Sequence, residues 1–208
     1  SEKGTRNLGF TFLTTAALLG IYLWTSVGTG VLVFGIAGAL AGFFYTAPPV
    51  RLAARHGLGE LAIAVTFGPL ITGGIFYVIT GEYSWMALLV GLPVGLLTAN
   101  ILLINEVPDA ESDASTGKNH LVVTFGKEKS ILIYSLIVAA AVASSVILAF
   151  QLENMWLLLP AILGGISAIP IVQTFRRNLH SRELVSANVN TIYFANCFGI
   201  LFLICLLM

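Results

Sequence analysis

Seven long apolar stretches restrict what this chain can fold into, because each is roughly long enough to cross a lipid bilayer as a helix. Such a helix needs about 20 predominantly apolar residues. Only 10% of the residues are charged, against about a quarter in soluble domains, which excludes an ordinary water-soluble globule. We therefore predict an all-α, polytopic transmembrane helical bundle that forms a single domain, residues 1–208. Its seven predicted spans lie at about 8–27, 31–47, 60–80, 84–104, 129–150, 155–175 and 187–208.

The basic residues occur only in alternate connections between these spans. By the positive-inside rule, the side that carries them is cytoplasmic. The same side holds the two longest polar loops, at 46–59 and 105–128, and long ordered loops tend to carry function. The ten acidic residues balance the ten basic ones, so no excess of charge indicates a nucleic-acid partner. The ten basic residues are Lys3, Arg6, Arg51, Arg55, Lys118, Lys127, Lys129, Arg176, Arg177 and Arg182.

A cluster of acids closes the fourth span and is the strongest chemical signal. If the segment stays helical beyond Pro108, Asp109 and Asp113 lie one turn apart on one face, with Asn105 a further turn upstream; Pro108 can also kink the segment and spoil this alignment. Like charges at this spacing repel, and a bound cation reverses the penalty. Carboxylate oxygens favour Mg²⁺, which shares its ligand shell with substrate phosphates. The alternative is a solvated acidic loop without a ligand.

Neighbouring residues allow two interpretations each. Lys118 offers a point charge for a diphosphate oxygen, but it also serves as a positive-inside anchor. Tyr45 ends the second span, where tyrosines often anchor at the membrane interface. Arg51 either binds phosphate or only marks the cytoplasmic side. Glu60 begins the third span, where the helix dipole favours an acid, so we predict a structural role for it.

Two loop segments together resemble the UbiA superfamily of intramembrane prenyltransferases. The first combines Asp109-x-x-x-Asp113 with Gly117-Lys118 and a Phe125-Gly126 ending. The second runs from Tyr45-Thr46-x-Pro48-Pro49-x-Arg51-Leu52 into Gly57-Leu58-Gly59-Glu60. Within this superfamily, the two segments are most similar in sequence to the menaquinone-pathway naphthoate prenyltransferases, and the resemblance extends over essentially the whole chain.

The resemblance implies nine transmembrane helices around a lipid-open cavity, and Asp-rich motifs that hold Mg²⁺ and a polyprenyl diphosphate. Asp109 and Asp113 match the second motif as metal-binding catalytic residues, and Tyr45 matches a catalytic tyrosine. Many members have a lysine where this chain has Pro49, so Arg51 is its substitute. The residues expected to bind substrate are Asn105, Lys118, Arg51 and Thr46.

The first Asp-rich motif of the family, of the form NDxxDxxxD, has no match in the sequence. We expect that about two N-terminal helices and half of the metal site are lacking, and that these 208 residues alone are inactive. With two further spans upstream, the cytoplasmic position of Ser1 and the alternation of loop charge are preserved.

The implied reaction is Mg²⁺-dependent transfer of an isoprenyl chain from its diphosphate to a small, aromatic or lipid-precursor acceptor in the membrane, as in quinone or related lipid biosynthesis. The implied partners are the polyprenyl diphosphate, the acceptor and membrane lipid, without nucleic acid. One rival class is a phospholipid head-group transferase, which predicts a DG…AR element that the sequence lacks. The other is a non-enzymatic transporter or lipid-binding scaffold with a solvated acidic loop.

Overall fold

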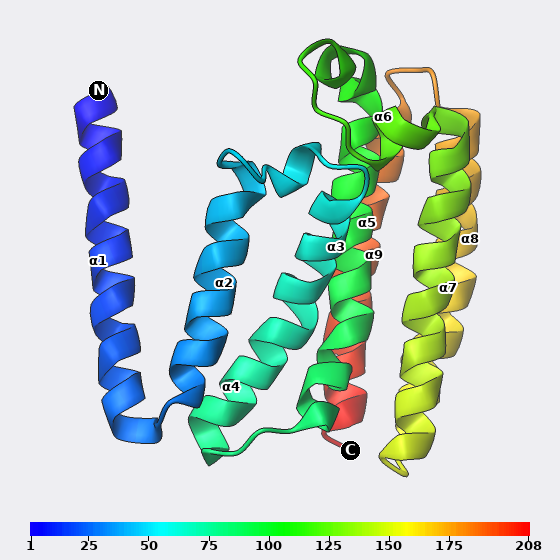
Figure 1. The fold of residues 1–208 in the computed structure, drawn as a ribbon. Coiled ribbons are helices and arrows are strands. Elements are labelled where there is room, and N and C mark those ends of the chain that lie inside the picture. Colours follow the sequence, from blue (N-terminus) through cyan, green and yellow to red (C-terminus); the bar gives the residue numbers. More distant parts are fainter.

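The chain is entirely helical. The computed structural model describes residues 1–208 and contains no β-strand, which confirms the predicted all-α class (Figure 1). Two short 3₁₀ turns, η1 (Leu52–Ala54) and η3 (Met155–Leu157), interrupt the connections. The main elements are α1 (Glu2–Val27), α2 (Gly30–Thr46), α3 (Leu58–Val65), the π-helical turn η2 (Thr66–Leu70), α4 (Ile71–Thr80), α5 (Trp85–Ser115), α6 (Leu121–Phe125), α7 (Lys127–Gln151), α8 (Leu158–Arg177) and α9 (Leu184–Leu206).

Each of the seven predicted spans falls on one helical rod. Helix α3, η2 and α4 join end to end into a single rod, Leu58–Thr80, which is the third of these spans. Six rods are long and apolar enough to cross a bilayer, whereas α2 has 17 residues and is shorter than the other rods. The chain is an integral membrane protein with a helical bundle fold, and the seventh span stays a prediction.

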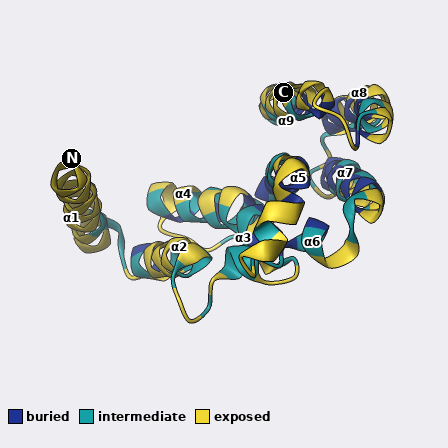
Figure 2. Ribbon diagram, turned by 90° about the horizontal axis from the view of Figure 1, so that it is seen from above, coloured by how far each residue is buried: buried dark blue, intermediate teal, exposed yellow.

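Helix α5 is the centre of the bundle. It packs against the α3–η2 rod on one side and against α7 and α9 on the other, while α1 lies at the edge beside α2 and has no buried residue (Figure 2). Buried side chains of α5 belong to one hydrophobic core with Tyr134 of α7, whose ring packs edge-on against that of Phe175 of α8. The outward surface is rich in exposed aliphatic and aromatic side chains, as a lipid-facing surface requires.

Glycines allow η2 to approach α5 backbone to backbone. A Cβ atom on Gly68 would lie 2.6 Å from the carbonyl oxygen of Gly91 and 3.0 Å from the Cα of Gly95. A Cβ atom on Gly95 would in turn meet the carbonyl oxygen of Ala64. Small residues allow close helix approach in membranes, and here they set the position of the α3 end of the rod relative to the polar end of α5.

Buried polar contacts tie α5, α7 and α9 together. The amide of Asn100 donates to the carbonyl oxygen of Tyr134 over 3.1 Å, and the Tyr134 hydroxyl lies 3.0 Å from that of Thr191. Asn100 thus makes an interhelical hydrogen bond, as polar side chains within membrane helices commonly do. These bonds hold the helices around α5 in one register below the acidic segment.

Candidate active site

Helix α5 continues without a break through Pro108 to Ser115. The condition for the predicted alignment is therefore met, and Asp109 and Asp113 lie one turn apart on the same helix. Asp109 is exposed, and its carboxylate takes part in none of the ion pairs of this region. Its oxygens are thus available for a ligand.

Asp113 is held by two neighbours. Its Oδ2 atom accepts from Nζ of Lys118 at 2.7 Å and lies 3.1 Å from Nε2 of His120. Lys118, the residue predicted to contact a diphosphate, is therefore paired with Asp113, and its side chain is 33% exposed. Because both contacts use Oδ2, Oδ1 of Asp113 stays available for a further ligand.

The predicted residues of the other loop lie around the end of α2. Tyr45 and Thr46 form its last turn, and Arg51 follows at the start of η1 with an exposed side chain. Arg55 differs, because its guanidinium donates to the carbonyl oxygens of Val50 and Pro49 over 2.8 Å each. Of the two arginines in this loop, Arg55 closes the loop and Arg51 is available to an anion.

The two sequence segments that carry the resemblance come together in space. The backbone of Asn119 exchanges hydrogen bonds with that of Ala54 at 3.3 Å and of His56 at 2.5 Å. The ring of His56 also lies 2.9 Å from the hydroxyl of Thr124. The loop after α2 and the loop after α5 therefore form one surface, although about 60 residues separate them in the sequence.

Asn105 contacts the last helix of the bundle. Its side-chain oxygen accepts from the amide of Asn188 of α9 over 2.8 Å. This places the predicted substrate-binding amide at the junction of α5 and α9, one turn before Asp109. The amide nitrogen of Asn105 is left for another partner.

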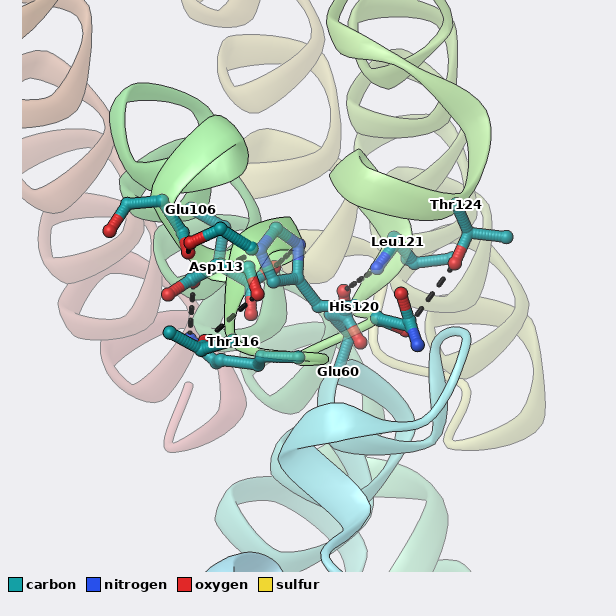
Figure 3. A network of polar contacts seen from close by, with 11 residues as sticks. Glu60, Glu106, Asp113, Thr116, His120, Leu121 and Thr124 are labelled. Carbon is teal, nitrogen blue, oxygen red and sulfur yellow. Dashed lines mark hydrogen bonds and ion pairs between the residues drawn. The ribbon is translucent and has the colours of Figure 1, made fainter.

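A buried polar cluster lies beneath the Asp113 carboxylate, and sequence reasoning did not find it. Glu60, Glu106 and His120 each offer one ligand atom, and these atoms lie within 4.8 Å of one another (Figure 3). Glu60 Oε1 accepts from the backbone N–H of Leu121 at 2.8 Å, so its role is larger than the predicted dipole contact in the first turn of α3. A signal was present: Glu106 and Asp113 are seven residues apart on one helix and share a face.

His120 is the central residue of this cluster. Burial lowers the pKa of its imidazole, and the positive charge of Lys118 lowers that pKa further, against the raising effects of Asp113 and Glu60. The ring is therefore favoured in its neutral form, with one nitrogen able to donate and the other able to accept.

An apolar groove adjoins the end of α2. Its volume is about 490 Å³, and it runs between α2 and the α3–η2 rod, with Gly38, Gly42, Ile63 and Phe67 among the residues that line it. Tyr45 also lines the groove and belongs to the last turn of α2. Tyr45 therefore lies where the apolar groove meets the loop that follows α2.

Comparison with known proteins points to one family. The profile of the UbiA prenyltransferase family matches residues 1–196. The chain is 36% identical over 129 residues to the 2-carboxy-1,4-naphthoquinone phytyltransferase of Synechocystis sp., covering 59% of this chain and 41% of that protein. It is 26% identical over 126 residues to the 1,4-dihydroxy-2-naphthoate octaprenyltransferase of Bacillus subtilis, covering 61% and 40%.

A third relative is from an animal. The UbiA prenyltransferase domain-containing protein 1 homolog of Drosophila melanogaster is 30% identical over 148 residues, covering 71% of this chain and 40% of that protein. The chain thus spans about two fifths of the length of the curated relatives it matches. No solved structure matches it significantly. With a helical membrane bundle, acids one turn apart at the end of α5 and a family profile that covers nearly the whole sequence, the chain belongs to the UbiA prenyltransferase family.

Proposed function

We propose that this chain is part of a membrane enzyme that transfers an isoprenyl chain from a polyprenyl diphosphate to a small aromatic acceptor. The family membership and the naphthoate-directed names of its relatives support this reaction class. The observation that carries the proposal is the Asp109–Asp113 pair, because it offers carboxylate oxygens without a protein partner one turn apart near the end of α5. One acceptor class, a naphthoate, follows from the relatives' names.

The donor set of this pair fits Mg²⁺. Asp109 has no protein partner for its carboxylate, and Asp113 keeps Oδ1 available, so both supply the oxygen ligands that Mg²⁺ prefers. When bound there with the diphosphate, Mg²⁺ would neutralise the negative charge that develops on the departing group. The same residues are the proposed metal ligands and catalytic acids of this chain.

Basic and polar side chains of the joined loops would bind the diphosphate. Arg51 has an exposed guanidinium with five donors suited to phosphate oxygens, and Lys118 adds a second positive charge from the other loop. When a diphosphate enters, Lys118 exchanges part of its contact with Asp113 for the ligand. Asn105 and Thr46 are proposed as further substrate contacts at the two edges of this surface.

The apolar groove would hold the isoprenoid chain and exclude water. An allylic carbon that loses its diphosphate becomes positively charged and reacts with water unless water is kept away. The aromatic ring of Tyr45, which lines the groove, can stabilise such a charge through its ring face. The single 208-residue domain would sit with these loops on the cytoplasmic side, as the loop charges predict.

Binding of a prenyl diphosphate analogue tests the proposal. The full chain, reconstituted in lipid nanodiscs, is titrated with a non-hydrolysable farnesyl diphosphate analogue with and without Mg²⁺. We expect Mg²⁺-dependent binding that weakens at least about tenfold in Asp109→Asn and in Asp113→Asn, which corresponds to about 1.4 kcal/mol. Glu111→Gln is the matched control, because this acid of the same helix is 90% exposed and pairs with Lys127.

Two results would contradict the proposal. One is binding that does not depend on Mg²⁺, and the other is equal binding by the wild type, the two aspartate variants and Glu111→Gln. Either result would favour a lipid-binding scaffold with a solvated acidic loop over a prenyltransferase.

A further inference from the structure

The cluster of Glu60, Glu106 and His120 takes no part in the proposed transfer of the isoprenyl chain. Its side chains come from three elements, since Glu60 begins α3, Glu106 lies on α5 and His120 precedes α6. The residues are only 3%, 5% and 1% exposed, so solvent cannot satisfy their polar atoms. The cluster is distinct from Asp109, which is exposed on the loop surface.

Three atoms of this cluster are buried without a hydrogen-bond partner. They are Oε2 of Glu60, Oε2 of Glu106 and Nδ1 of His120. A buried polar atom without a partner is destabilising, and a buried unpaired charge is more so. Because each of the three residues has a ligand atom within 4.8 Å of the other two, one positively charged partner placed between them can compensate both carboxylates.

The orientation of His120 indicates which partner fits. Its Nε2 lies 3.1 Å from Oδ2 of Asp113, while its Nδ1 lies 3.4 Å from Oε2 of Glu106 (Figure 3). A neutral imidazole that donates Nε2–H to Asp113 presents the lone pair of Nδ1 to the cluster. Metal-binding histidines show this arrangement, because their second ring nitrogen donates to a carboxylate.

The spacing also suits a small cation. Two ligands of a tetrahedral ion with bonds of about 2.0 Å lie roughly 3.3 Å apart, close to the 3.4 Å between Nδ1 of His120 and Oε2 of Glu106. One nitrogen and two carboxylate oxygens form a borderline donor set that favours zinc-like transition metals, whereas Mg²⁺ and Ca²⁺ prefer oxygen alone. Three protein ligands leave a fourth position for water.

We propose that Glu60, Glu106 and His120 bind one divalent transition-metal cation of the zinc class. The ion compensates the two buried carboxylates and joins α3, α5 and the start of α6. Through His120 it also holds the Asp113 carboxylate in place. The site is therefore a structural centre beneath the diphosphate surface, and its ligands are positioning residues with respect to Asp113.

Metal content is the direct test. The full chain in nanodiscs is stripped with a chelator and dialysed against Zn²⁺ in an excess of Mg²⁺, which competes for oxygen-only sites. We expect one Zn²⁺ per chain by elemental analysis, a higher unfolding temperature with Zn²⁺ than without, and loss of both effects in Glu106→Gln. Asp109→Asn is the matched control and retains the zinc, because Asp109 lies outside the cluster.

The alternative to a bound metal ion is a proton shared between Glu60 and Glu106. The variant Glu106→Gln distinguishes these two arrangements. Glutamine imitates a protonated glutamate, so a shared proton predicts that this variant is as stable as the wild type and that neither protein responds to Zn²⁺. That result overturns the proposal. If Glu106→Gln does not fold, the wild-type protein alone tests the proposal. With Co²⁺ in place of Zn²⁺, a four-coordinate site gives intense absorption bands in the visible range. The absence of these bands overturns the proposal.

Failure of this metal site is distinguishable from failure of the prenyl-transfer proposal. Asp109→Asn is expected to weaken Mg²⁺-dependent binding of the diphosphate analogue at least about tenfold and to retain Zn²⁺. Zinc content and cobalt absorption are measured without any substrate. Each proposal can therefore fail while the other stands.

Discussion

Replacement of Gly68 by alanine tests whether close approach of η2 and α5 sets up the polar end of the bundle. The Cβ atom of Gly68→Ala would lie 2.6 Å from the carbonyl oxygen of Gly91 and 3.2 Å from its carbonyl carbon. These neighbours are backbone atoms of α5, so no side-chain rotation relieves the clash.

The size of the effect follows from this geometry. Ordinary contact begins near 3.4 Å, so the rod and α5 must separate by roughly 0.8 Å from the 2.6 Å position. Overpacking of this kind costs about 1–3 kcal/mol. Alanine is favoured over glycine in a helix by about 0.5–1 kcal/mol, so we expect a net loss of about 1–2 kcal/mol in the free energy of unfolding.

The assay compares two variants in which a helical glycine is replaced by alanine. Unfolding by SDS in mixed micelles, followed by loss of helicity, yields the free energy of unfolding of Gly68→Ala and of Gly165→Ala. Gly165 lies in α8 and has no atom within 4 Å of an added Cβ. We expect Gly165→Ala to be neutral or slightly more stable than the wild type.

Equal stability of the two variants would refute the reasoning, because the backbone contact would then not limit the approach of η2 to α5. A loss of similar size in both variants would refute it as well, because Gly165→Ala introduces no close contact and the shared loss would then not come from the backbone contact at Gly68.

Other substitutions probe the loops and the interior. Arg55→Gln should reduce thermal stability through loss of its bonds to two loop carbonyls, whereas Arg51→Gln should leave stability unchanged and weaken binding of the diphosphate analogue in the nanodisc titration. Lys118→Met should weaken that binding about tenfold or more, and equal affinity would show that Lys118 only neutralises Asp113. Asn100→Ala, which removes a bond to α7, should cost about 0.6 kcal/mol in SDS unfolding; a neutral result would mean that this bond contributes nothing.

The class of the fold and the positions of its helices could be predicted from the sequence. Apolar stretches of about 20 residues leave few choices in a bilayer, where every backbone polar group must be satisfied within a helix. The sequence left open whether the helix continues beyond Pro108, and the structure shows that it does. The sequence predicted no direct contact between the loop after Tyr45 and the loop after Asp113, and the structure joins these two loops through the backbone of Asn119.

Side-chain partners were decided by the tertiary structure. The sequence predicted that Lys118 provides a positive charge for a diphosphate, but it did not predict the ion pair of Lys118 with Asp113. The sequence also did not show that Arg55, unlike Arg51, binds two carbonyl oxygens of its own loop. Glu60 and Glu106 are separated by 46 positions, and His120 lies on the far side of a turn. Local periodicity places a residue on a face of its own helix, but which faces meet depends on the packing of η2 against the glycines of α5. The buried cluster exists only because that packing brings α3, α5 and the start of α6 together.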